Sequence, residues 1–322
     1  NGGAGNDTYR FNTGDVDSGE SITEASSGGT DTVSIITSTD FANMSNASFD
    51  EIDVINFGGA SQTATFTGAQ LTSETISLTE TAAGTSNLVI NVGAGGTGAF
   101  TNITAASSFT SGADTVTING STGNETITGP NIATTITGGA GTDTITGGTQ
   151  ADIIEGGDGA DALVGGTGND TYRFNTGDVD SGESITEASS GGTDTVSIIT
   201  STDFANMSNA SFDEIDVINF GGASQTATFT GAQLTSETIS LTETAAGTSN
   251  LVINVGAGGT GAFTNITAAS SFTSGADTVT INGSTGNETI TGPNIATTIT
   301  GGAGTDTITG GTQADIITGG DG

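Results

Sequence analysis

An aspartate recurs at every ninth residue in one stretch of the chain, each time two residues before a bulky apolar side chain. Four blocks between Gly138 and Arg173 read GGAGTDTIT, GGTQADIIE, GGDGADALV and GGTGNDTYR. Glycine permits left-handed turns that expose backbone carbonyls. Aspartate carboxylates are hard anionic oxygens, which suit calcium. The spacing therefore predicts a series of calcium-binding turns.

Three strand residues follow each turn and would hold it in place. They alternate out, in and out, as a β-strand does, so the eighth residue of each block is predicted to be buried. Two degenerate blocks, residues 120–128 and 129–137, extend the pattern backward, with Glu125 and Thr134 in place of the aspartate. The predicted core ladder is Ile127, Ile136, Ile145, Ile154, Leu163 and Tyr172.

These blocks resemble the nonapeptide repeats of the RTX family, whose G-G-x-G-x-D-x-U-x pattern forms a parallel β-roll filled with calcium. The resemblance implies that successive turns lie on opposite edges of the roll, so that one coil takes two blocks. Calcium would then lie between turns one coil apart, held by aspartate carboxylates and glycine carbonyls. This pairs Asp143 with Asp161 on one edge and Asp152 with Asp170 on the other.

The first blocks of the run depart from the family pattern. Glu125 could complete a site with Asp143, whereas Thr134 offers no charge beside Asp152, which predicts a weak or missing site there. Gln150 stands where the family has glycine, so the turn around Asp152 is expected to depart from the family's turn. The predicted metal ligands are Asp7, Glu125, Asp143, Asp152, Asp161, Asp170, Asp306 and Asp315, with the turn glycines Gly138, Gly139, Gly141, Gly147, Gly156, Gly157, Gly159, Gly165, Gly166 and Gly168.

An acidic stretch follows each nonapeptide run, at residues 11–24 and again at 174–187. Its carboxylates could cap the roll with a further calcium or form a solvated acidic loop, and the sequence leaves both open. The further candidate ligands are Asp15, Asp17, Glu20, Asp178, Asp180, Glu183, Asp158, Asp321 and Glu288. Residues 27–35, after the first acidic stretch, are predicted to form a turn and a strand. Glu24 and Glu74 are interpreted as ordinary solvated surface acids.

The whole chain repeats itself with a period of 163 residues. Residues 1–159 align with 164–322, and the only differences are Asn1/Val164, Ala4/Thr167 and Glu155/Thr318. Each unit should therefore be one structural module. The chain starts and stops inside nonapeptide runs, so we expect it to be a window cut from a longer array.

The composition is strongly acidic, with 36 acidic residues, two arginines and a net charge of −34. This balance argues against a nucleic-acid partner, because phosphate binding needs a basic surface, and against docking on anionic lipid. Hydrophobic residues make up 32%, and low hydrophobicity with high charge favours disorder unless a metal neutralises the carboxylates. No apolar run approaches the roughly 20 residues of a membrane span, so we expect no direct membrane insertion.

The nine-residue rule lapses between the runs, from about residue 37 to residue 110. Strands are predicted at 52–57, 75–80, 88–92 and 114–119, and a short helix at 41–49. The spacer phenylalanines are Phe41, Phe49, Phe57, Phe66, Phe100 and Phe109. A wider β-solenoid that continues the coil is favoured over an inserted β-sandwich. The predicted domains are 1–36 (end of a roll and cap), 37–110 (spacer), 111–199 (calcium roll and cap), 200–273 (second spacer) and 274–322 (second roll).

Few catalytic groups are available, because the chain has no histidine, cysteine or lysine. Nucleophilic catalysis by Ser-His-Asp or Cys-His is excluded by residue type. Arg10 or Arg173 could in principle serve a calcium-dependent lyase. A surface ion pair with the neighbouring acidic turns explains these arginines better. The residue types present do not exclude a glycosidase, because its paired carboxylates are available among the 36 acidic residues. Ice binding by the repeated Thr-Ile-Thr is also disfavoured, since on a two-sided roll the ladder has two rungs. We therefore expect no enzyme.

The leading hypothesis is an all-β, calcium-stabilised repeat of a bacterial surface layer, surface filament or giant adhesin, which folds after export. RTX-like proteins are typically exported by type I secretion. Further copies of the same repeat are the expected partners, through self-assembly into a filament or layer, and a surface polysaccharide or another cell-surface ligand is a candidate. The alternative is an RTX-like secretion and folding module of a secreted enzyme or toxin whose catalytic domain lies outside this chain.

Overall fold

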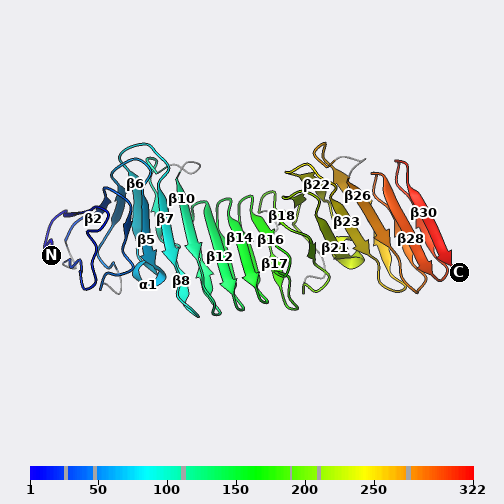
Figure 1. Cartoon of the computed structure of the whole chain (residues 1–322), viewed down its shortest axis with the longest axis horizontal. Coiled ribbons are helices and arrows are strands. Elements are labelled where there is room, and N and C mark those ends of the chain that lie inside the picture. The colour runs from blue at the N-terminus through cyan, green and yellow to red at the C-terminus, as the bar shows by residue number, and fades with distance from the viewer. Residues whose placement is uncertain (25–27, 46–48, 110–113, 189–190, 209–211, 273–276) are drawn as a thin grey trace. The chain divides into compact units, whose positions relative to one another are not determined.

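The regular secondary structure of the computed structural model is almost entirely short strands, which pair in parallel (Figure 1). It describes residues 1–24, 28–45, 49–109, 114–188, 191–208, 212–272 and 277–322. The chain divides into two compact units, residues 1–156 with 163–168 and residues 157–162 with 169–322. Each unit is described by itself below.

The first unit winds its strands into three parallel ladders. One ladder contains β1 (Thr8–Phe11), β2 (Thr32–Ile35), β4 (Val54–Phe57), β6 (Ile76–Glu80) and β9 (Ile103–Ala105), in that order. A second contains β3 (Thr39–Asp40), β5 (Thr63–Thr67), β7 (Asn87–Asn91), β10 (Thr115–Asn119) and β12 (Thr134–Ala140). The third contains β8 (Thr97–Ala99), β11 (Thr126–Thr128) and β13 (Thr144–Gly148). β14 (Ile153–Asp158) and β15 (Ala162–Gly166) complete the nonapeptide run, and each has residues in both units.

The second unit repeats this arrangement. Its first ladder contains β16 (Thr171–Phe174), β18 (Thr195–Ile198), β20 (Val217–Phe220), β22 (Ser240–Glu243) and β25 (Thr267–Ala268). The second contains β19 (Thr202–Asp203), β21 (Thr226–Thr230), β23 (Asn250–Asn254), β26 (Thr278–Asn282), β28 (Thr297–Ala303) and β30 (Ile316–Asp321). The third contains β24 (Thr260–Ala262), β27 (Thr289–Thr291) and β29 (Thr307–Thr309). β17 (Ser184–Thr186) lies in the acidic stretch.

The coils differ in width along each unit. In the nonapeptide run, contacts between neighbouring coils join residues 18 apart, whereas in the spacer they join residues 22 to 28 apart. Both kinds of coil pair their strands in parallel from one coil to the next. The predicted parallel β-roll or β-solenoid is confirmed. The alternative of an inserted β-sandwich is wrong for the described part of the spacers, because a sandwich requires antiparallel sheets.

The predicted spacer strands correspond to β4, β6, β7 and β10, but β5, β8 and β9 were not anticipated. The helix predicted at 41–49 is wrong: residues 42–45 form turns and bends, and 46–48 lie outside the described residues. Phe41 follows β3, and its N–H donates to the Thr65 carbonyl at 2.8 Å, which joins it to the neighbouring coil. The helices of the described residues are α1 (Gly68–Leu71) and its copy α2 (Gly231–Leu234). A capping box between Thr67 and Gln70 begins α1. Neither helix is long or apolar enough to cross a membrane.

The interior changes with coil width. In the narrow coils a single ladder fills the core, and its six predicted members are all 0% exposed. In the wide coils phenylalanines fill the larger space: Phe41 stacks on Phe66 with ring centroids 4.6 Å apart, and Phe49 meets Phe66 edge-on at 5.2 Å. Aromatic pairs at these distances add to the burial energy. Larger side chains therefore allow the longer coils to stay closed.

Polar side chains join neighbouring coils on the outer faces of the spacer. Thr79 Oγ1 donates to Asn56 Oδ1 at 2.9 Å, and Asn119 Nδ2 donates to Asn91 Oδ1 at 3.0 Å. The second unit has the same contacts. These hydrogen bonds stack like side chains in register and help to fix one coil over the next.

Replacing the central aromatic side chain of the wide coils should destabilise the fold. We expect Phe66→Ala combined with Phe229→Ala to lower the free energy of unfolding by about 3–5 kcal/mol per unit, because each leaves a cavity in a packed core. The measurement is urea unfolding in saturating calcium. The matched control, Thr65→Ala with Thr228→Ala, alters half-buried positions on the same strands and should cost less than about 0.5 kcal/mol. Equal effects of the two variants would contradict this account of the core.

Candidate calcium sites

The nonapeptide acids share one hydrogen-bond pattern between coils. Asp143 Oδ1 accepts the N–H of Glu125 at 2.7 Å, and Asp152 Oδ1 accepts the N–H of Thr134 at 2.8 Å. The second unit repeats both bonds at 3.0 Å, from Glu288 to Asp306 and from Thr297 to Asp315. One carboxylate oxygen of each aspartate is thereby fixed by the preceding coil.

The second oxygen of Asp143, Asp152 and Asp306 lies inside the protein, whereas Asp315 Oδ2 accepts the Gly311 N–H at 2.8 Å. Asp306 Oδ2 is buried and has no hydrogen-bond partner among the described residues, and the same holds for Asp7 Oδ2. In Asp143, which is 0% exposed, burial raises the pKa of the carboxyl, although the bond from the Glu125 N–H opposes this and the Glu125 charge adds to it. A buried carboxylate is costly unless a partner compensates its charge. The arrangement therefore favours a bound cation.

Turn glycines leave the space that such a cation needs. A Cβ atom added at Gly147 would lie 2.6 Å from Asp152 Oδ2 and 2.6 Å from the Gly165 carbonyl oxygen. Calcium binds oxygen ligands at about 2.3–2.6 Å. At Gly138 the same position adjoins Asp143 Oδ2 and lies 2.6 Å from the Gly156 carbonyl oxygen. The residues therefore fit calcium, since each cradle combines a carboxylate and a carbonyl around a site that only glycine keeps open.

The turn conformation follows the glycine pattern. Gly139 and Gly141 have φ values of +115° and +133°, which other residues rarely adopt. The other predicted turn glycines with positive φ are Gly157, Gly159, Gly166 and Gly168. In the second block neither Gly148 nor Gln150 has a positive φ, so this turn follows a different path. The weak site expected beside Thr134 remains a prediction.

Glu125 is compensated by backbone donors. Its Oε1 accepts the Gly95 N–H at 2.6 Å and its Oε2 accepts the Ser121 N–H at 2.9 Å. Burial raises the pKa of Glu125, but hydrogen bonds from the N–H groups of Ser121, Gly95 and Gly123 outweigh it and the net shift is downward. Its copy Glu288 is held in the same way. Backbone donors therefore compensate the Glu125 carboxylate, and the expected calcium site with Asp143 remains a prediction.

Three carboxylates converge where the nonapeptide run passes into the spacer. In the second unit the ligand atoms of Asp170, Glu187 and Asp194 all lie within 4.8 Å of one another. Asp194 Oδ1 accepts the Asp170 N–H at 2.8 Å, and the Tyr172 hydroxyl donates to Glu187 Oε1. Burial raises the pKa of Glu187 to about 7, and the charges of Asp194 and Asp170 contribute. The first unit contains the same cluster, formed by Asp7, Glu24 and Asp31.

Sequence reasoning missed part of this cluster. The interpretation of Glu24 as a solvated surface acid is wrong, because Glu24 Oε2 is buried and Oε1 contacts the Tyr9 hydroxyl. Asp31 carried a signal: it follows two glycines and precedes a buried valine by two residues, as the nonapeptide aspartates precede their core residue. Glu24 carried no such signal, since the folding of the acidic stretch alone brings it to Asp7.

The acids of the first acidic stretch do not gather. Asp15, Asp17 and Glu20 are exposed, and the Asn12 N–H bond lowers the pKa of Asp15. In the second copy Asp178 and Glu183 are buried and Asp180 is exposed. The remaining candidates, Asp158 and Asp321, are exposed.

The predicted pairs Asp143–Asp161 and Asp152–Asp170 each have one member in either unit. They remain predictions, because each unit is described by itself.

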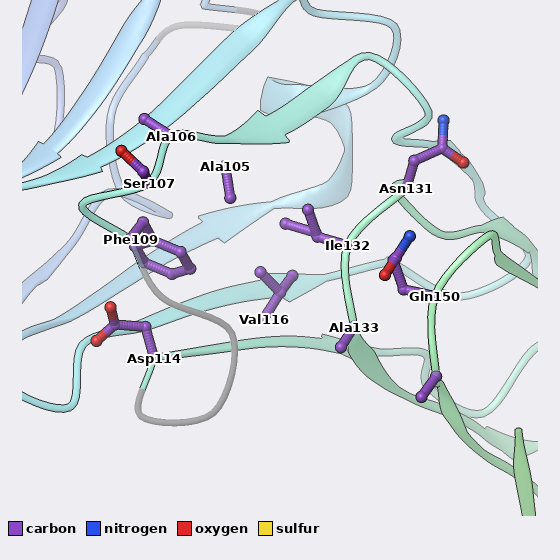
Figure 2. A pocket seen from close by; sticks show the side chains of 11 residues that line it. Ala105, Ala106, Ser107, Phe109, Asp114, Val116, Asn131, Ile132, Ala133 and Gln150 are labelled. Atoms are coloured by element: carbon purple, nitrogen blue, oxygen red, sulfur yellow. The ribbon is translucent and has the colours of Figure 1, made fainter. Parts of the chain in front are cut away.

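A pocket of about 610 Å³ lies beside β10, where wide coils give way to narrow ones. Figure 2 shows the side chains of Phe109, Val116 and Ile132 on its wall. Its single carboxylate, Asp114, accepts the Ser86 N–H at 2.7 Å. The second unit has a similar pocket of about 480 Å³. The change of coil width accounts for this hollow, and its lining offers no cluster of metal ligands.

Glu74, which was also interpreted as solvated, is half-buried beside two other acids. Burial raises its pKa to about 7, with contributions from the charge and hydrogen bond of Asp50 and from the charge of Glu51. Its copy Glu237 has the same environment and a pKa of about 7. Each carboxyl therefore holds its proton up to near neutral pH.

Filling one glycine cradle should remove one calcium ion. We expect Gly147→Ala to bind one calcium fewer than the parent chain, because the added methyl group would occupy the space between Asp152 and the Gly165 carbonyl. The measurement is calcium titration calorimetry. The control is Gly93→Ala, where an added Cβ has nothing within 4 Å and the backbone φ is not positive. An unchanged stoichiometry in Gly147→Ala would show that this cradle holds no ion.

The raised pKa of Glu74 and Glu237 predicts a pH-dependent stability. Their pKa is about 7 in the fold against an ordinary 4.5, so the folded protein binds the protons more tightly. This stabilisation is fully present below pH 4.5 and is lost as the pH rises through 7. We expect Glu74→Gln with Glu237→Gln to lose less stability than the parent between pH 5 and 8, measured by urea unfolding in saturating calcium. Parallel losses would contradict the assignment.

The comparisons agree with the geometry of the turns. The family model of the RTX calcium-binding nonapeptide repeat matches the chain in four copies, at residues 137–172 and 296–322. No curated protein and no solved structure matches the chain. The matched segments contain Asp143, Asp152 and Asp306, whose carboxylates border the glycine cradles. The chain therefore carries RTX calcium-binding nonapeptide repeats, and calcium is the ion that these turns bind.

Proposed function

We propose that this chain is a calcium-stabilised structural repeat of an extracellular bacterial surface protein, such as a surface layer, a surface filament or a giant adhesin. The observation that carries the proposal is the set of buried carboxylates along the coil edges of a chain with 36 acids and two bases. Arginine cannot neutralise so many carboxylates. Calcium binding would neutralise them, and its binding energy becomes folding energy.

The internal duplication supports a structural role. Both units have the same succession of wide and narrow coils, and in each unit strands pair in parallel with those of the neighbouring coils. Stability in such repeats comes from contacts between neighbours, which allows the stack to be extended by further copies. Further copies of the unit are therefore the proposed partners, and a surface polysaccharide or another cell-surface molecule is the proposed ligand class of an adhesin.

The residue types support a role other than catalysis. The chain has no histidine, cysteine or lysine, and its carboxylates are repeated along the edges rather than gathered around one reactive cleft. Near-identical copies are more typical of a structural array than of a duplicated active site. Nucleic acid is not a proposed partner, because the net charge of −34 repels phosphate.

The calcium chemistry supports folding outside the cell. RTX repeats are typical of proteins that leave the cell by type I secretion. Calcium sites of extracellular modules often have dissociation constants of about 10⁻⁴–10⁻³ M, so they would stay empty in a calcium-poor cytosol. We therefore propose that the chain is exported unfolded and folds when it meets external calcium.

Imaging of intact cells tests the proposed location. We expect antibodies against this chain to label the outer surface as a layer or as filaments in electron micrographs. Treatment with EGTA should release the label, because the coils lose their cations. Label confined to the cytosol would contradict the proposal. Label found only in the medium, on a protein with a catalytic domain, would favour a secretion module instead.

A further inference from the structure

Glu183 lies in the acidic stretch that follows the nonapeptide run ending at Arg173. It follows a turn of the acidic stretch, precedes β17 and is 0% exposed. Its Oε2 accepts the Asp161 N–H at 2.8 Å, across 22 residues. The aspartates inside the run accept the same kind of bond across 18 residues. Glu183 therefore takes the place that an aspartate of the next nonapeptide would occupy, although the nine-residue spacing does not reach it.

The other oxygen of Glu183 has no partner among the described residues. Oε1 is buried and accepts no hydrogen bond within the part of the chain that the structure describes. The charges near Glu183 are those of the Asp161, Asp178 and Asp180 carboxylates, which have the same sign as its own. Asp161 and Asp178 are themselves 0% and 8% exposed. A buried oxygen among buried carboxylates calls for a positive partner.

Glu125, at the start of the run, shows what a compensated glutamate looks like in this fold. Its two oxygens accept N–H groups from Gly95 and Ser121. Glu183 receives one N–H and keeps its second oxygen buried. Glu125 and Glu183 lie at the two ends of the nonapeptide run. Within the described residues, backbone N–H groups bond both oxygens of Glu125, but only one oxygen of Glu183.

We propose that Glu183 and Asp161 bind a calcium ion that closes the nonapeptide run at its C-terminal end. Carboxylate oxygens are ligands that suit a hard cation with flexible coordination. The inference deepens the proposed function and rests on calcium being the bound ion, but not on where in the bacterium the protein works.

The chain offers a matched control for this site. Glu20 is the copy of Glu183 in the first unit, and the position 163 residues before Asp161 lies outside the chain. Glu20 is exposed, and its Oε2 accepts the N–H of Asp17 within its own turn. The same substitution at Glu20 therefore changes the charge equally without touching the proposed ion.

The experiment counts bound calcium in the whole chain by equilibrium dialysis with elemental analysis, alongside calcium titration calorimetry. We expect Glu183→Gln to bind one calcium ion fewer than the parent and Glu20→Gln to bind the parental number. Glutamine keeps the shape of Glu183 and an oxygen acceptor for the Asp161 N–H. Asp178→Asn is a second variant, and we expect it to weaken the affinity of one ion.

A parental calcium count in Glu183→Gln, with unchanged affinities in Asp178→Asn, would overturn the proposal. Circular dichroism in saturating calcium checks that the variants keep their sheet; if Glu183→Gln does not fold, the affinities of Asp178→Asn decide alone. Failure of the proposed function looks different: either the parent chain binds no calcium, or it binds calcium but is absent from the cell surface.

Discussion

The fold depends on carboxylates that join one coil to the next and remain buried while they do so. Asp152 fixes one oxygen on the Thr134 N–H of the preceding coil, and its other oxygen borders the space that Gly147 keeps open. The hydrogen bond sets the register of the coils. The second oxygen gives each coil edge a negative charge that the chain, with two arginines, cannot neutralise. Calcium is therefore a component of the fold, because the same contacts that stack the coils create the charge that calcium removes.

The same strand pairing supports two kinds of coil, and the interior decides which one forms. A narrow coil closes over a single ladder residue such as Ile145, whereas a wide coil closes over a cluster of rings around Phe66. The hollow lined by Phe109 and Val116 marks the step between the two widths. Carboxylates continue into the wide coils, where Asp31 and Asp53 accept N–H groups from the preceding coil. The spacer is thus a continuation of the coil by other side chains.

The parts of this structure that depend on local spacing could be predicted from the sequence. The core ladder and the turn glycines obey a strict period, and alternation reveals strands such as β4 and β10. The helix predicted around Met44 is wrong because the N–H of Phe41 is bonded to the Thr65 carbonyl of the neighbouring coil. Glu24 could not be assigned to a buried site, and for Glu183 the sequence left a calcium cap and a solvated loop open, because the path of the acidic stretch brings them to their partners. The hydrogen bonds that neutralise Glu125 come from Gly95, which no local pattern connects to it.

The most direct test is circular dichroism of the purified chain as free calcium is raised from EGTA-buffered to millimolar levels. The account predicts little β-sheet without calcium and a cooperative gain of sheet as calcium binds, reversed by chelation. Magnesium at the same concentration should give a much smaller gain, because it demands a stricter geometry and keeps its water. A full sheet signal in EGTA that calcium does not change would contradict the claim that calcium completes this fold.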